Sequence, residues 1–171
     1  MKSRGFSLIE VMMALIIISV GLLGIAKMQA LALASTGTAR LRSLASIQAA
    51  SLASAMHTDR AYWTTSGIAS VTITGKTISD TTLAAVHSCT GSGGTRPSPA
   101  CTPTQMAAED LQVWAAAMQA VLPNDSAIIA CSGTPVTCTI TINWAEHIVN
   151  SNQQETTGAL PPTTYQLAVE P

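Results

Sequence analysis

The sequence is poor in charged and aromatic residues. Charged side chains make up 10% of the 171 residues, against roughly 25% in ordinary soluble domains, and aromatic side chains make up 4%. The motifs GxSxG, HExxH, CxxC and the Walker loop are absent from it. The three histidines, His57, His87 and His147, lie far apart in sequence and have no nucleophile partner. We therefore expect no enzymatic activity, no cofactor and no metal.

The net charge of −1 hides two regions of opposite sign. Residues 1–57 carry a net charge of +4, with Glu10 as their single acidic residue, whereas residues 58–171 carry −5. The acidic region has no cluster of Lys and Arg that would contact phosphates. Nucleic acid is therefore not expected as a partner.

A run of apolar residues extends from Phe6 to Ala26. As a helix rising ~1.5 Å per residue, it spans about 30 Å, which is the thickness of the hydrocarbon core of a bilayer. Lys2 and Arg4 precede the run, so the positive-inside rule places the amino terminus in the cytoplasm and everything after Ala26 outside. Glu10 lies within the run, where a carboxylate is costly and usually functional.

A secretory signal peptide is an alternative explanation of this run. The segment ALALAS (30–35) offers a small-residue cleavage site, and cleavage near Ala34 would release a secreted enzyme or binding module. However, the run is longer than the usual core of roughly 7–15 residues, and Lys27 interrupts the approach to the cleavage site. A signal peptide also leaves Glu10 unexplained.

Four cysteines fall into two close pairs without the short spacings of a metal site. An even number of cysteines after a membrane-targeting segment indicates disulfides in an oxidising compartment. Three pairings are possible, with free thiols as the alternative. The local pairs Cys89–Cys101 and Cys131–Cys138 are favoured, because CSGTPVTC (131–138) reads as a hairpin whose ends come within bridging range.

The segment RGFSLIEVMMAL (4–15) resembles the start of type IV pilins and of type II secretion pseudopilins. Both have a short basic leader that ends in glycine, then phenylalanine, then glutamate as the fifth mature residue. The resemblance implies a leader at 1–5, cleavage between Gly5 and Phe6 by prepilin peptidase, and N-methylation of Phe6. It also implies that Glu10 pairs with the Phe6 amino group of a neighbouring subunit as the helices bundle.

Three further segments resemble minor pilins of the pilus modification (PilV) type: GLLGIAKMQ (21–29), AAEDLQVWAAAMQAVLP (107–123) and ITINWAE (140–146). This resemblance implies a protein of the bacterial inner membrane whose head lies in the periplasm. It would join other minor pilins and the major pilin through the amino-terminal helices and help to prime the pilus, and so support twitching motility and adhesion. Lys27 stands where many major pilins have proline, which favours a minor pilin or a pseudopilin. A minor pseudopilin of type II secretion remains the alternative.

We expect an α+β pilin fold, with a long helix over 6–57, transmembrane at 6–26, and a globular head over 58–171. The outer half of the helix should pack on a small antiparallel sheet, and the poor helix formers of STGT (35–38) should loosen the helix. A stripe at helical spacing, apolar except for Gln48, should face the core: Leu41, Leu44, Ala45, Gln48, Leu52, Ala55 and Met56. Strands are expected at 67–75, 127–131, 136–144 and 164–170.

A second helix is expected at 102–122. Thr102 can cap it, Pro103 suits its first turn and Gln105 completes a capping box. Glu109 and Asp110 should lie near the positive end of the helix dipole. The loop between Cys89 and Cys101, rich in Gly, Ser and Pro, should lie at the surface.

Overall fold

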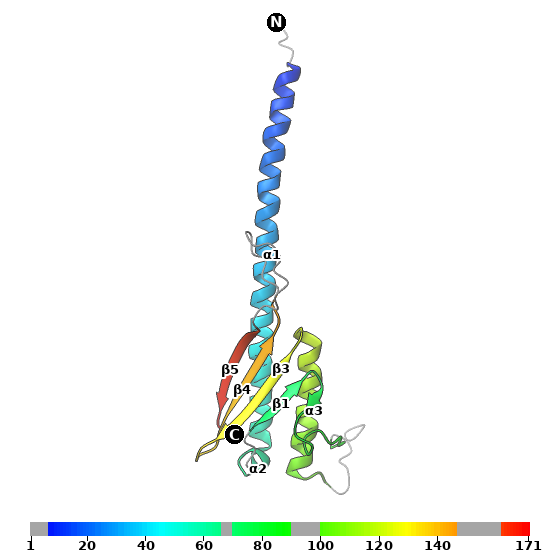
Figure 1. Ribbon diagram of the computed structural model, residues 1–171, viewed down its shortest axis with the longest axis vertical. Coiled ribbons are helices and arrows are strands. Elements are labelled where there is room, and N and C mark those ends of the chain that lie inside the picture. Colours follow the sequence, from blue (N-terminus) through cyan, green and yellow to red (C-terminus); the bar gives the residue numbers. More distant parts are fainter. Residues whose placement is uncertain (1–6, 66–69, 90–99, 147–161) are drawn as a thin grey trace. The chain divides into compact units, whose positions relative to one another are not determined.

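The computed structural model describes residues 7–65, 70–89, 100–146 and 162–171 (Figure 1). Contacts divide the chain into two units, with a boundary between Ala39 and Arg40, inside the first helix. The described residues from Arg40 onward form the second unit, which we call the head. The expected leader, Phe6 and its cleavage site lie outside the described residues.

The first helix, α1 (Leu8–Thr58), is continuous over 51 residues. The expected loosening at 35–38 was wrong, because helical residues run through this stretch without a break. The hydroxyls of Thr36 and Thr38 donate to backbone carbonyls one turn earlier, at 2.8 and 3.0 Å, so these polar side chains are satisfied within the helix. Alanine and leucine on both sides favour the helix, and no proline interrupts it.

The sheet of the head has five antiparallel strands in the order β2-β1-β3-β4-β5. Their bounds are β1 (Val71–Thr74), β2 (Thr77–Ile78), β3 (Ser126–Ser132), β4 (Thr137–Trp144) and β5 (Thr163–Val169). The four expected strands are present, and the first is shorter than predicted; residues 66–69 lie outside the described part of the chain. The two-residue strand β2 was not predicted, because it is too short to show an alternating pattern.

Alternation along the strands sends one set of side chains to the core. On β4, Cys138, Ile140, Ile142 and Trp144 are buried as expected, whereas Val136 precedes the strand and is half-buried. The core also receives a stripe of α1 within the head: Ala45, Ala49, Leu52 and Met56. The sequence reading missed Ala49, and it placed Leu41, Leu44 and Ala55, which are partly buried, in the same stripe.

Helix α3 (Pro103–Val121) begins as the sequence indicates. The Thr102 hydroxyl accepts from the Gln105 N–H at 3.3 Å, and the Gln105 side-chain oxygen accepts from the Thr102 N–H at 2.9 Å. The helix buries Ala107, Ala108, Leu111, Trp114, Ala115 and Met118. The indole N–H of Trp114 donates to the Gln48 carbonyl at 2.8 Å and so joins α3 to α1 within the head.

A four-residue helix, α2 (Arg60–Trp63), follows α1 and was not predicted. Its Tyr62 and Trp63 are buried, and their rings meet edge to face with centroids 5.2 Å apart. This short helix therefore closes the core at the end of α1, in the region that the sequence reading treated only as the end of the long helix.

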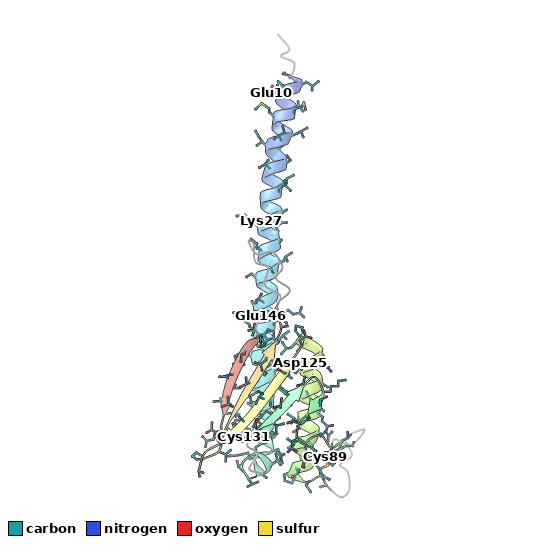
Figure 2. The ribbon with its side chains drawn as sticks, in the orientation of Figure 1. Glu10, Lys27, Cys89, Asp125, Cys131 and Glu146 are labelled. Atoms are coloured by element: carbon teal, nitrogen blue, oxygen red, sulfur yellow. A yellow bond between two sulfur atoms is a disulfide. The ribbon has the colours of Figure 1, made fainter. Side chains whose placement is uncertain are left out.

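The cysteines pair locally, as the sequence favoured. The Cα atoms of Cys89 and Cys101 are 5.7 Å apart. Cys131 and Cys138 lie directly opposite each other on β3 and β4, with their Cα atoms 3.9 Å apart. One disulfide therefore closes the segment that precedes α3, and the other closes the β3–β4 hairpin (Figure 2).

Candidate assembly site

The first part of α1 exposes apolar side chains on all its sides. All residues from Leu8 to Ala26 are exposed, and Leu23, for example, keeps 71% of its surface accessible. The helix is long and apolar enough to cross a membrane. A helix that is apolar all round requires lipid or other helices to cover it. This surface is therefore built for a membrane or for a bundle.

Glu10 is the acidic residue of this surface and lies in the first turn of α1. A carboxylate in the first turn interacts favourably with the positive end of the helix dipole. Among the described residues of the chain, Glu10 has no ion-pair partner. Gly5 and Phe6, the other expected site residues at this end, lie outside the described residues.

Lys27 is the next charged residue after Glu10. The two are 17 positions apart, which corresponds to about 26 Å along a helix. Figure 2 shows them at the two ends of the apolar stretch. The uncharged stretch between them thus approaches the thickness of the hydrocarbon core of a bilayer.

Within the head, an ion pair between the exposed Arg42 and the buried Glu146 joins α1 to the residues that follow β4. The Arg42 guanidinium donates from Nε to Glu146 Oε1 at 3.2 Å and from Nη2 to Oε2 at 3.3 Å. The Glu146 side chain is only 3% exposed, and it also accepts from the Trp144 indole N–H at 3.2 Å. The carboxylate raises the pKa of Arg42 above its usual value, first through the hydrogen bonds and then through its charge.

The sequence reading did not find this ion pair, because 104 residues separate its two members. Arg42 reads as an ordinary solvent-facing charge, and Glu146 follows the predicted strand without any local signal. A contact of this kind joins distant parts of the chain, and it depends on how α1 and the end of β4 are placed in the folded head.

A second acidic group lies at the end of α1. Asp59 is 7% exposed and its Oδ2 atom has no hydrogen-bond partner in the described structure. Burial, followed by the charge of Asp110 on α3, raises the pKa of Asp59 to about 6, although a hydrogen bond from the Ala107 N–H opposes the shift. Burial also raises the pKa of Asp125, which precedes β3.

The expected stabilisation of Glu109 and Asp110 by the dipole of α3 needs correction. Helix α3 begins at Pro103 and has no acidic residue in its first turn, where the dipole acts most strongly. Instead, burial and the neighbouring charge of Glu109 raise the pKa of Asp110. Glu109 has a structural role, since its carboxylate accepts the backbone N–H of Cys89 and so holds the disulfide segment against α3.

The described residues contain no group of three His, Cys, Asp or Glu side chains placed to hold a metal ion. His57 is exposed and His87 is half-buried, whereas His147 lies outside the described residues. The notable charges of the described chain are therefore Glu10 and Lys27 on the apolar helix, and the buried acidic groups of the head.

Comparison with known proteins identifies the amino-terminal segment. Residues 1–26 match the prokaryotic N-terminal methylation motif. No curated protein and no solved structure matches the chain. The motif, the long apolar helix and the α+β head together support a type IV pilin-like or pseudopilin protein. Proteins with this motif are structural rather than enzymatic, and the helix is compatible with a membrane anchor.

Proposed function

We propose that the protein is a minor pilin of a type IV pilus, of the PilV type, which takes part in priming pilus assembly. The observation that carries the proposal is the methylation motif over residues 1–26, on a helix that is exposed and apolar on all its sides. The head would lie in the periplasm and the amino terminus in the cytoplasm of a bacterial inner membrane, following the positive charges of Lys2 and Arg4. Twitching motility and adhesion would depend on it through the pilus.

Processing by prepilin peptidase would occur between Gly5 and Phe6. Cleavage creates a new amino group on Phe6, four residues before Glu10, and methylation would keep this amine able to carry a positive charge. The cut therefore removes the leader and leaves a positively charged amino terminus four residues before an acidic residue.

Glu10 would then direct assembly. A carboxylate within hydrocarbon is expensive, and an opposite charge is the natural way to offset that expense. The amino group of Phe6 on a neighbouring subunit would supply this charge. Because only one axial offset brings the two groups together, the pair would set the stagger between adjacent helices, including those of other minor pilins and of the major pilin.

The assignment to the PilV type depends on the head. The segment of α3 and β4 that resembles PilV supplies the buried Trp114 and Trp144, and it ends at Glu146. A minor pseudopilin of type II secretion is the second candidate, because it would share the methylation motif and because the absence of proline at Lys27 favours it as well. Co-purification with pilus components rather than with secretion components would distinguish the two.

The experiment that tests the proposal is the intact mass of membrane-extracted protein, followed by its incorporation into sheared pili. A mature chain that starts at N-methyl-Phe6 is expected. Glu10→Gln should keep this mass and lower incorporation at least tenfold, whereas Glu10→Asp, which retains the charge, should restore most of it. A chain that starts near Ser35 would show that the run is a signal peptide, and unchanged incorporation of Glu10→Gln would remove the role given to Glu10.

A further inference from the structure

Asp59 lies between the end of α1 and the start of α2, and its carboxylate does not do what its position suggests. It is the N-cap residue of α2, yet its side chain makes no capping hydrogen bond with that helix. An aspartate at an N-cap ordinarily accepts the N–H of the second or third helical residue. The carboxylate instead accepts the backbone N–H of Ala107 on α3. Asp59 therefore faces α3 and not its own short helix.

One oxygen of this carboxylate is buried without a partner. The Asp59 residue is 7% exposed, and its Oδ2 atom is buried and has no hydrogen-bond partner in the described structure. Taking a carboxylate oxygen out of water is costly unless a hydrogen-bond donor or a cation replaces the lost water. Oδ2 of Asp59 therefore requires a partner that the described residues do not provide.

The groups around Asp59 add negative charge. Asp110 lies three residues after Ala107, on the same side of α3, and its charge acts on Asp59. The charge of Glu109 acts in turn on Asp110. Asp59 also follows the carboxyl-terminal end of α1, which is the negative end of the helix dipole. Among the described residues, no Lys or Arg forms an ion pair with Asp59 or Asp110, so this negative region has no positive charge of the head to balance it.

We propose that Asp59 and Asp110 bind a calcium ion between the end of α1 and α3, with Oδ2 of Asp59 as its buried ligand. Calcium takes carboxylate, carbonyl and water oxygens and accepts irregular coordination, whereas magnesium demands a nearly ideal octahedron. Glu109 already accepts the N–H of Cys89, and the described residues hold no cluster of three metal-binding side chains. Water and backbone carbonyls would therefore complete the site, with a dissociation constant of about 10⁻⁴–10⁻³ M, as in extracellular calcium modules.

The ion would act as a cross-link within the head. One ligand lies where α1 ends and the other lies on α3, so a single ion would connect the two helices next to α2. It would also offset the repulsion between the two carboxylates, which the head otherwise bears when both are ionised. Because the ion binds the folded head and not the unfolded chain, the stability of the head should rise with the concentration of calcium.

The test uses the full chain in detergent micelles, freed of metal by a chelator, with Tb³⁺ as a luminescent probe of the calcium site. Tyr62 and Trp63 follow Asp59 on α2, and Trp114 lies four residues after Asp110 on α3, so these rings should sensitise the emission of an ion bound here. Emission should saturate as Tb³⁺ is added. Ca²⁺ should bind with a dissociation constant of about 0.1–1 mM and reverse the emission, and Mg²⁺ should bind at least tenfold more weakly.

Asp59→Asn and Asp110→Asn should each weaken Ca²⁺ binding at least tenfold, because each removes a charged ligand while keeping the shape of the side chain. The matched control is Asp125→Asn. Asp125 is 6% exposed and also has an Oδ2 atom without a partner, but it precedes β3, so this variant should bind Ca²⁺ within about twofold of the wild type. Saturating Ca²⁺ should raise the unfolding temperature of the wild-type head by about 5 °C and leave that of Asp59→Asn nearly unchanged.

Three results would overturn the proposal. Emission that does not saturate, or that Ca²⁺ at about 10 mM does not reverse, would show that the head has no calcium site. Unchanged binding by Asp59→Asn would place the ion elsewhere. Equal weakening by Asp125→Asn would show a general effect of acidic residues and not a site. The proposal goes beyond the pilin function, and none of these results depends on leader cleavage or on Glu10.

Discussion

The two parts of α1 make one continuous helix and yet meet opposite environments. Up to Ala39 the helix exposes large apolar side chains, whereas from Arg40 onward it buries a stripe that includes Leu52 and Met56. The difference lies in where polar residues fall: they are nearly absent before Ala26, and in the second part they occupy the sides away from the core. Both parts therefore form helix, and the positions of the polar residues decide what each part contacts.

The most direct test of this difference is to make the same substitution in both parts of the helix. Leu52→Ala, at a side chain 1% exposed, should lower the free energy of unfolding of the head by about 3 kcal/mol, because it removes buried methyl groups and leaves a cavity. The matched control Leu23→Ala should change it by less than about 0.5 kcal/mol. Chemical denaturation followed by tryptophan fluorescence measures both, and equal losses would contradict the division.

Covalent closure also distinguishes the head from the first part of α1, whose described residues include no cysteine. Replacing both cysteines of either disulfide with serine should lower the stability of the head by about 2–3 kcal/mol on the chain-entropy model, slightly more for Cys89–Cys101 because its loop is longer. Urea midpoints with and without reductant provide the measurement. An unchanged midpoint for both variants would show that the core alone holds the head together.

The head should lose stability as the pH rises from about 4 to about 6. The pKa of Asp59 is about 6 in the folded chain and near 3.8 when unfolded, so between these values the folded state binds the extra proton. Ionisation then costs on the order of 2 kcal/mol at neutral pH. Asp59→Asn should flatten most of this dependence, with a smaller slope left by Asp110 and Asp125, whose pKa values are raised in the same direction.

Unfolding midpoints at several pH values, compared between the wild type and Asp59→Asn, measure this effect. A wild-type head that grew more stable from pH 5 to pH 7 would have the opposite sign and would place the Asp59 carboxylate in a solvated or paired environment.

The parts of the structure predicted from sequence are those with local signals. The start of α3 is predicted by a capping signal within four residues: Thr102, Pro103 and Gln105. The alternation over β4 predicts its buried face. Strand β2 and helix α2 were not predicted, because two and four residues are too few for periodicity. The same limit applies to Arg42 and Glu146, whose contact depends on the tertiary fold.

The residues of the candidate site also divide into those with a local sequence signal and those that only the fold reveals. Glu10 was found because a carboxylate in an apolar run departs from the local pattern, and the sequence alone shows such a departure. The raised pKa of Asp59 was not foreseen, because its causes arise only in the fold: burial of the carboxylate first, and then the charge of Asp110 on α3. The position of β5 at one edge of the described sheet likewise follows from strand order, which the sequence does not state.

The Arg42–Glu146 ion pair has a mechanical consequence. Arg42 lies two positions beyond the start of the head, and its guanidinium holds the carboxylate that follows β4 with two hydrogen bonds. A pulling force carried along α1 would therefore enter the sheet through this pair and the neighbouring Leu41 before it reached the buried stripe of the helix. The pair would bear that load as shear across two hydrogen bonds at once.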